Sequence, residues 1–302
     1  MTNSTSLIYI ALVMTFLSSC RLDDNMFNPD AGISSYLLDD YAGKVDFQLD
    51  ERYAIPADKI HLITLQSQTA SEAGSTTIHG IYIGDLNRIA TDTVIMYCHG
   101  NRDHMDFYWQ RAKLLANAGG KNRYGVLMID YRGYGLSSGR PTESGMYADV
   151  NAGLHWLRDA GLTGDRLVSY GFSLGSAPAT EIAAYYKKYA LRASKLILEA
   201  PFASTAVMVQ DAALLSMPSS FFTSVQVNNA DKIRKVVQPF LWMHGVNDSF
   251  LNINTHGEVV FKNYGGNSGV PIRVPRAEHG DLPKIMGFEE YNQAIVQFIT
   301  TP

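Results

Sequence analysis

The sequence predicts an α/β fold with a mostly parallel central sheet that helices cover on both faces. Apolar runs of strand length alternate along the chain with segments of helical spacing, and this alternation is typical of strand–helix–strand units. Thr93–Cys98 and Tyr124–Asp130 are nearly continuous apolar runs, as expected of strands that are buried on both sides. A third run, Leu167–Tyr170, leads into a tight turn, and a helix rich in small residues follows that turn.

Local patterns define the individual elements. Lys59–Gln68 and Thr76–Ile83 alternate apolar and polar residues on either side of Gly74, which predicts an antiparallel hairpin at the start of the sheet. Further strands are expected at Thr93–Cys98, Tyr124–Asp130, Leu167–Tyr170, Lys195–Glu199, Gln238–His244 and Val270–Val274. Helices are expected at Met105–Ala118, Glu143–Ala160, Asn252–Lys262 and Ile285–Ile299, together with the helix that follows residue 175.

Length and composition favour one large globular domain. The chain has 302 residues, of which 46% are hydrophobic and 18% charged, and this fits a sizeable core. We expect the domain over residues 51–302, with a tether and N-terminal arm at 21–50 and a cap insertion at 201–230. The formal net charge is -4 and the sequence has no basic tract, so nucleic acid is not an expected partner.

The N-terminus resembles a bacterial lipoprotein signal. Leu7–Leu17 is apolar but too short to span a membrane, and it suits the apolar region of a signal peptide. The Leu17-Ser18-Ser19-Cys20 segment that follows resembles a lipobox, in which the cysteine is acylated and becomes the mature N-terminus. We therefore expect a signal peptide over residues 1–20, lipidation at Cys20, and a protein attached to a membrane of the bacterial cell envelope. An ordinary secretory signal or a disordered tail is the alternative, because Met1–Ser6 contains no Lys or Arg.

The turn Gly171-Phe172-Ser173-Leu174-Gly175 has the G-x-S-x-G pattern of a nucleophile elbow. A strand that reverses into a helix within so few residues strains the serine backbone, and a side chain at either glycine would crowd the neighbouring backbone. The helix behind the turn presents free N–H groups and its positive dipole end to a developing oxyanion. We expect Ser173 to be the nucleophile; the alternative is a glycine-rich turn with a passive serine.

Three loops that follow strands supply partners for this serine. The backbone N–H of Asn101 is expected to form an oxyanion hole with that of Leu174. Asp248 follows a later strand, and His279 lies between the last strand and the closing helix. A carboxylate can orient and stabilise an imidazolium, so these residues predict a catalytic triad of Ser173, Asp248 and His279.

Other acidic and histidine side chains near these loops need a different interpretation. Glu199 also ends a strand from which a triad acid can come, but the Pro201-Phe202 that follows it fits a buried structural carboxylate better. Asp281 is expected to cap the loop or the closing helix. We interpret His99 as a packed or hydrogen-bonding residue rather than a general base.

One further segment links the chain to a known family. The run from Asp130 to Ser137, Asp-Tyr-Arg-Gly-Tyr-Gly-Leu-Ser, continues to Gly139-Arg140-Pro141-Thr142-Glu143 and resembles the signature of abhydrolase-domain serine hydrolases. The same resemblance extends to His99-Gly100-Asn101, Leu198–Phe202 and His244-Gly245, and the order Ser173, Asp248, His279 is that of α/β-hydrolases. It implies the α/β-hydrolase fold and a serine-hydrolase activity. Members act on esters, lipids and thioesters of acylated proteins, and some bacterial relatives are named serine aminopeptidases. The Arg102-Asp103-His104 segment departs from the small residues common at that place.

These observations together predict a serine hydrolase that cleaves carboxylic esters or thioesters through an acyl-enzyme. The expected substrate is an acyl ester, thioester or amide, and no cofactor or metal is expected. A serine peptidase or amidase on the same triad is one alternative, and a non-catalytic binding lipoprotein is another. Apolar residues of the insertion could cap an acyl pocket or simply pack on the body: Met208, Leu214, Leu215, Met217, Phe221 and Phe222.

Overall fold

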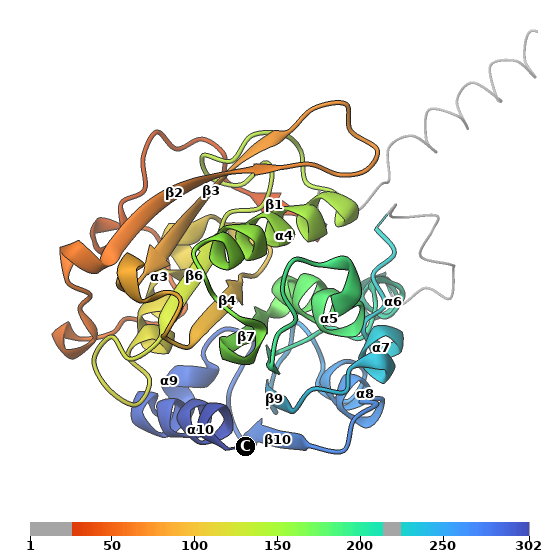
Figure 1. Cartoon of the computed structure of the whole chain (residues 1–302). Coiled ribbons are helices and arrows are strands. Elements are labelled where there is room, and N and C mark those ends of the chain that lie inside the picture. The colour runs from red at the N-terminus through yellow and green to blue at the C-terminus, as the bar shows by residue number, and fades with distance from the viewer. Residues whose placement is uncertain (1–25, 214–224, 302) are drawn as a thin grey trace, which may run out of the picture.

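A computed structural model describes residues 26–213 and 225–301 of the chain (Figure 1). An eight-stranded sheet in the order β10-β9-β8-β7-β4-β6-β3-β2 forms its centre. The strands are β2 (Ile60–Ser67), β3 (Thr76–Ile83), β4 (Val94–Cys98), β6 (Gly125–Ile129), β7 (Leu167–Phe172), β8 (Lys195–Glu199), β9 (Phe240–Gly245) and β10 (Gly269–Val274). β3 pairs antiparallel with β2 and with β6, and the pairs from β6 through β10 are parallel. The predicted mostly parallel sheet with an opening hairpin is confirmed.

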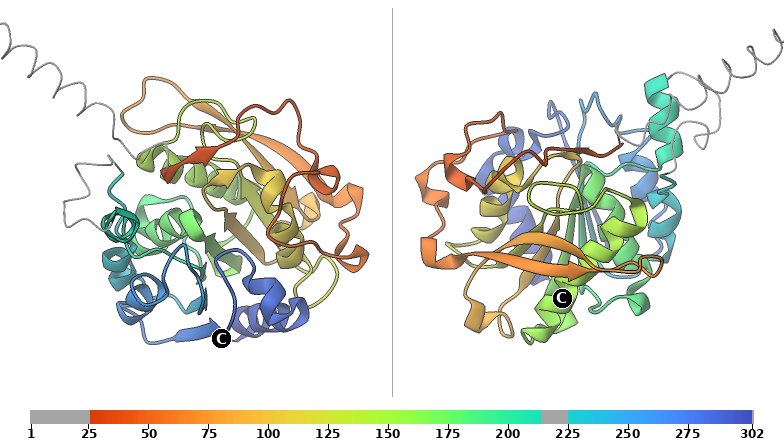
Figure 2. Two further views of the ribbon diagram at one scale, coloured as in Figure 1. Left: turned by 180° about the vertical axis from the view of Figure 1, so that it is seen from behind. Right: turned by 90° about the horizontal axis from the view of Figure 1, so that it is seen from above.

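Helices cover both faces of the sheet. α3 (Met105–Ala116) and α10 (Phe288–Thr300) pack on one face, whereas α4 (Glu143–Asp159), α5 (Ser176–Ala184) and α8 (Gly257–Lys262) pack on the other. The view from above shows the two helical layers on opposite sides of the strands (Figure 2, right). Alternate side chains of a strand point to opposite faces, so Met96 of β4 joins one core and Tyr97 the other. Both cores exclude water, as the nearly continuous apolar strands require.

The N-terminal arm packs along the body of the domain. Its residues 28–29 form β1 (Asn28–Pro29), which pairs in parallel with β5 (Arg102–Asp103), a two-stranded element that the sequence did not predict. The backbone N–H groups of Leu37 and Leu38 donate to the buried carboxylate of Asp106, at 2.9 and 2.8 Å. Figure 2, left, shows this arm (red to orange) on the side hidden in Figure 1. The arm therefore braces the loop that follows β4.

Two predicted helices differ from the structure. The closing helix expected over Ile285–Ile299 is confirmed from Phe288 onward as α10, but its first two residues belong to a separate helix, α9 (Leu282–Met286). Gly287 separates them with a φ of +95°, a conformation that interrupts a right-handed helix. Of the helix expected over Asn252–Lys262, only the second half forms, as α8 (Gly257–Lys262). The insertion contributes α6 (Thr205–Ala213) and α7 (Asn229–Lys232).

Several predicted features lie outside the described residues. They include the signal peptide and Cys20, and five of the apolar residues in the insertion: Leu214, Leu215, Met217, Phe221 and Phe222. Met208 is described, and its half-buried side chain packs against the core. Within residues 26–213 and 225–301, no helix has both the length and the apolar character needed to cross a membrane.

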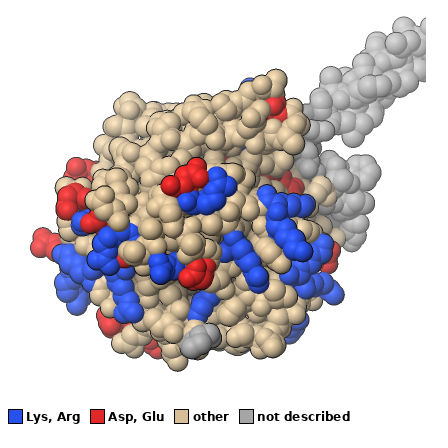
Figure 3. Space-filling model, viewed as in Figure 1, with Lys and Arg blue, Asp and Glu red and all other residues tan. Residues whose placement is uncertain are grey.

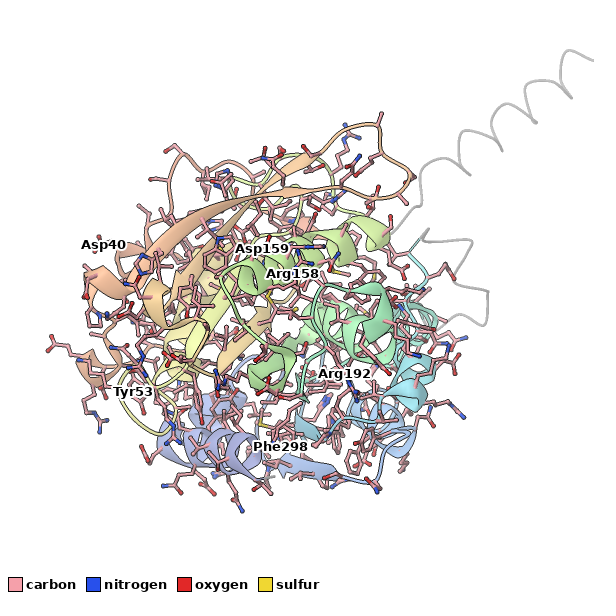
Figure 4. All side chains as sticks on the ribbon, in the orientation of Figure 1. Asp40, Tyr53, Arg158, Asp159, Arg192 and Phe298 are labelled. Atoms are coloured by element: carbon pink, nitrogen blue, oxygen red, sulfur yellow. The ribbon has the colours of Figure 1, made fainter. Side chains whose placement is uncertain are left out.

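The face seen in Figures 1, 3 and 4 is the one where the parallel strands begin. Arg158, Asp159 and Arg192, labelled in Figure 4, belong to the connections that lead into β7 and β8. Lys and Arg side chains gather in the lower part of this face (Figure 3). The loops that follow the carboxyl ends of the strands, which hold the predicted catalytic residues, therefore lie on the opposite side of the molecule.

Candidate active site

The turn after β7 holds Ser173 in a strained backbone conformation. Ser173 has a φ of +51°, opens the short 3-10 helix η6 (Ser173–Gly175), and is followed directly by α5. A Cβ atom at Gly175 would collide with the carbonyl oxygen of Cys98, and one at Gly171 would lie 2.5 Å from the carbonyl oxygen of Gly175. The two glycines are therefore needed for the close approach of strand and helix, as the sequence predicted.

The structure brings the three predicted triad residues together from three separate connections. Nε2 of His279 lies 2.8 Å from Oγ of Ser173, and Nδ1 of the same ring lies 2.8 Å from Oδ2 of Asp248. Because an ionised carboxylate only accepts hydrogen bonds, Nδ1 carries the proton and Nε2 is free to accept from the serine hydroxyl. This arrangement is able to remove a proton from Ser173 when the hydroxyl attacks an electrophile.

Asp248 is buried and surrounded by hydrogen-bond donors. The backbone N–H groups of Phe250 and Leu251 donate to its Oδ1 at 3.0 and 2.7 Å, and Nε2 of His244 lies 3.2 Å from its Oδ2. Burial by itself raises the pKa of Asp248, but the hydrogen bonds from His244 and His279 outweigh burial and hold the pKa well below its ordinary value. The carboxylate is therefore ionised at neutral pH and can stabilise a protonated His279.

Glu199, the other candidate acid, is engaged elsewhere. Its Oε1 accepts from Nη2 of Arg111 at 3.0 Å, and its Oε2 accepts from the hydroxyl groups of Tyr170 and of Tyr291, the latter at 2.8 Å. The side chain is fully buried. This agrees with its interpretation as a structural carboxylate. Asp281 accepts from the backbone N–H of Glu278 at 2.7 Å and so caps the loop that carries His279.

The two residues predicted to supply the oxyanion hole lie next to the serine, because Leu174 follows it in the chain and Asn101 lines the same cavity. Asn101 follows β4, and its carbonyl oxygen accepts from the N–H of Asn28 at 3.0 Å and from the hydroxyl of Tyr134 at 3.1 Å. Leu174 lies in the first turn of the helix behind Ser173, where N–H groups lack intrahelical acceptors. The arm and Tyr134 thus fix the peptide that follows Asn101. The peptide that carries the Asn101 N–H is held at the Gly100 carbonyl oxygen, 2.7 Å from Nδ1 of His99, while the start of the helix fixes that of Leu174.

The segment from Tyr131 supports this loop, and His99 is packed within it. The hydroxyl of Tyr131 donates to the carbonyl oxygen of His99 at 2.9 Å. The imidazole of His99 is fully buried, with ring centroids 4.7 Å from Tyr108 and 4.4 Å from Tyr131, and its Nε2 lies 3.3 Å from Asp130. These contacts agree with the interpretation of His99 as a packed residue.

A cavity of about 220 Å³ opens over Ser173 and His279. Aromatic and charged side chains that the sequence did not single out line it, together with the predicted site residues: Asp46, Asn101, Arg102, Phe107, Tyr108, Phe172, Ser173, Phe250, His279 and Gly280. Phe250 packs its ring edge-on against His279 with the centroids 5.0 Å apart. Its position two residues after Asp248 is the signal in the sequence that could have identified it. Asp46 comes from the N-terminal arm, whose contacts no local pattern indicates.

Comparisons with known proteins identify the superfamily. The model of the family described as serine aminopeptidase, S33, matches residues 90–239. The chain is 28% identical over 207 residues to alpha/beta hydrolase domain-containing protein 17C of Xenopus tropicalis, covering 68% of this chain and 61% of that protein. It is 29% identical over 208 residues to human alpha/beta hydrolase domain-containing protein 17B, and this match covers 68% of this chain and 66% of that protein. The match therefore spans less than two thirds of the length of these relatives.

Solved structures share the fold at low sequence identity. An esterase of Pyrococcus furiosus aligns with a TM-score of 0.64 and 16% identity over 90% of this chain and 98% of that chain. A serine hydrolase without a lid from Xanthomonas campestris aligns with a TM-score of 0.53 and 16% identity over 82% and 99%. The sheet order, the turn after β7, the sequence relatives and these structures together make the chain a member of the α/β-hydrolase superfamily.

Proposed function

We propose that this protein is a serine hydrolase that cleaves carboxylic esters or thioesters through an acyl-enzyme. The observation that carries the proposal is the chain of two 2.8 Å contacts from Ser173 through His279 to Asp248, at a turn that strains the serine backbone. A passive serine in a glycine-rich turn needs neither the strain nor an imidazole that is oriented by a buried carboxylate. The family model and the relatives, which are named as hydrolase-domain proteins, agree with this class of reaction.

Each step of the proposed reaction has a residue that can carry it out. His279 takes the proton of Ser173 at Nε2 while the serine oxygen bonds to the acyl carbon, and Asp248 stabilises the resulting imidazolium. The N–H groups of Asn101 and Leu174 hold the oxyanion. His279 then gives the proton to the departing alcohol or thiol as its bond to the acyl carbon breaks. Water, deprotonated by the same imidazole, attacks the ester of Ser173 and releases the acid.

The cavity wall favours an acyl group over a charged substrate. Four of the residues that line it are aromatic: Phe107, Tyr108, Phe172 and Phe250. A peptidase or amidase on the same triad is the second candidate, because Asp46 could face the ammonium group of a peptide. Oδ2 of Asp46, however, lies 3.5 Å from Nη1 of Arg111, which partly offsets its charge. The ester or thioester therefore fits this cavity better.

We propose a cellular site for the reaction from the N-terminal sequence. The lipobox at Leu17–Cys20 supports a proposal that the protein is anchored by lipid to a membrane of the bacterial cell envelope. A non-catalytic lipoprotein that binds ligands in the same cavity remains the contrasting hypothesis, and reactivity of Ser173 distinguishes the two.

A fluorophosphonate probe tests the proposed function. The wild type should react with one probe molecule at Ser173, and Ser173→Ala should abolish both labelling and the hydrolysis of nitrophenyl esters or acyl thioesters. Ser176→Ala is the matched control, because Ser176 is a buried serine one turn away that hydrogen-bonds to Asn229 at 3.1 Å. A wild-type protein that does not react with the probe would contradict the proposal. Faster turnover of aminoacyl amides than of esters would favour the peptidase.

A further inference from the structure

A buried arginine outside the triad contacts the residues next to two of its members. Arg111 belongs to α3, and its side chain is 2% exposed. Nη2 of Arg111 donates to the carbonyl oxygen of Gly280 at 2.9 Å, and Gly280 directly follows His279. The same nitrogen donates to Oε1 of Glu199 at 3.0 Å. The guanidinium thus ties the backbone of Gly280, the residue after the histidine, to a fixed carboxylate at the end of β8.

The same guanidinium also stacks on the residue before the serine. Its central carbon lies 3.9 Å from the ring centroid of Phe172, within the range of a cation–π contact. Phe172 directly precedes Ser173, and its ring centroid is 5.4 Å from that of His279. The ring of Phe172 therefore contacts both the guanidinium of Arg111 and the imidazole of His279. A shift of the guanidinium would change the support of the serine and of the histidine together.

The position of Arg111 is itself fixed. Glu199 is held by the hydroxyl groups of Tyr170 and Tyr291, and Asp46 lies on the other side, 3.5 Å from Nη1. Burial by itself lowers the pKa of Arg111, but the charges of Glu199 and Asp46 raise it, so the guanidinium stays charged. A planar fork can bond to a carboxylate and a carbonyl while its face covers a ring, whereas a lysine ammonium presents a single point charge.

We propose that Arg111 is a positioning residue that sets the distance between Oγ of Ser173 and Nε2 of His279. This inference rests on the proposed serine-hydrolase function. Arg111 touches neither the reacting serine oxygen nor the imidazole nitrogens, and it acts through Gly280 and Phe172. Its loss should therefore lower the rate of the chemical step and leave substrate binding nearly unchanged.

The test compares Arg111→Lys with Arg132→Lys. Arg132 is the matched control, because it is also 2% exposed and paired with a buried carboxylate, Asp149, at 2.9 Å. Its other side-chain hydrogen bonds go to Glu72 and Ser67, and none of these partners is adjacent to a triad residue. Arg111→Lys should lower kcat and the rate of fluorophosphonate labelling by about a hundredfold, with KM changed by less than about threefold. Arg132→Lys should lower the thermal unfolding temperature and keep kcat close to that of the wild type.

A second variant guards against a folding defect. The double variant Arg111→Gln with Glu199→Gln removes both members of the fully buried pair, and only Asp46, 21% exposed, loses a partner. Its kcat should fall as far as that of Arg111→Lys, whereas the kcat of Glu199→Gln alone should fall far less. A kcat within threefold of the wild type in Arg111→Lys, or an equal loss in Arg132→Lys, would overturn the inference.

Crystal structures separate this inference from the proposed function. The distance from Ser173 Oγ to His279 Nε2, 2.8 Å here, should lengthen in Arg111→Lys and stay the same in Arg132→Lys. An unchanged distance in Arg111→Lys would overturn the positioning role even if the wild type proved to have no hydrolase activity. An inactive, unlabelled wild type would refute the proposed function alone.

Discussion

Oδ2 of Asp248 lies 2.8 Å from Nδ1 of His279, and Oδ1 of the same carboxylate is held by the backbone N–H groups of Phe250 and Leu251. Hydrogen bonds within its own loop thus hold the carboxylate in position for its contact with the imidazole. Glu199 has no such relationship to the ring, since its hydrogen bonds go to Arg111, Tyr170 and Tyr291. Of these two acids, therefore, Asp248 is the one that contacts the imidazole.

Asp248→Asn should lower kcat by about 10⁴-fold with little change in thermal stability. An amide at this position can still accept from the Leu251 N–H, but it neither fixes the Nδ1–H tautomer nor stabilises a positive imidazole. Steady-state kinetics and thermal unfolding of the purified variant provide the measurements. Glu199→Gln is the comparison, and it should cost far less activity, with any loss following reduced stability. A well-folded but inactive Glu199→Gln beside an active Asp248→Asn would show that the acid is misassigned.

His256 should make the stability of the protein depend on pH. Burial lowers the pKa of His256 to about 4, and its Nδ1 accepts from the backbone N–H of Ala203 at 3.1 Å. The unfolded chain, with a histidine pKa of about 6.5, binds the proton first, so acid favours unfolding. The free energy of unfolding should therefore fall by up to about 1.4 kcal/mol per pH unit between pH 6.5 and about 4.

Chemical denaturation of the wild type and of His256→Asn at pH 7 and pH 5 measures this effect. Asparagine can still accept from the Ala203 N–H but does not titrate, so the variant should lose less stability on acidification. His155→Asn, at an exposed position of α4, controls for the removal of a histidine as such. Parallel pH profiles for the wild type and His256→Asn would contradict the assignment.

Cys20 is expected to determine where the protein resides. In a bacterial host the full-length wild type should partition with membranes and carry lipid, because the cysteine of a lipobox is acylated. Cys20→Ser should lose the lipid and leave the membrane fraction. Mass spectrometry of the N-terminus and fractionation of the cells give the two readouts. A soluble wild type that retains Met1 would show that the segment is not a lipoprotein signal.

The fold and the triad constellation could be predicted because local patterns encode them. Apolar runs and helical spacing determine the strands and helices, and the glycines beside Ser173 report a turn whose geometry only glycine permits. The break at Gly287 was missed because a single glycine costs little in a periodic pattern. Arg111 could not be found from the sequence, since its partners Asp46, Glu199 and Gly280 are distant along the chain and meet only in the folded protein.

The residues around the proposed acyl pocket also could not be predicted in full from the sequence. The sequence predicted a cap from apolar residues of the insertion, and the two phenylalanines among them, Phe221 and Phe222, lie outside the described residues. The described part of the chain offers Phe250 instead, whose side chain lies on the boundary between two cavities. One is the cavity of about 220 Å³ over Ser173, and the other, of about 530 Å³, is lined by Met208, Gln210, Asp211, Ser249, Phe250, Leu251, Asn252, Thr255 and His256.

Phe250→Ala should shift ester hydrolysis toward longer acyl chains. The Phe250 ring is shared by the two cavities and is 57% exposed, so its removal joins them without a large loss of core packing. A series of nitrophenyl esters of increasing chain length measures kcat/KM for each substrate, and the length giving the highest value should increase in the variant. Phe250→Tyr, which keeps the ring beside His279, should retain the wild-type profile. If Phe250→Ala and the wild type prefer the same chain length, Phe250 does not limit the acyl pocket, and its contact with His279 is confined to packing.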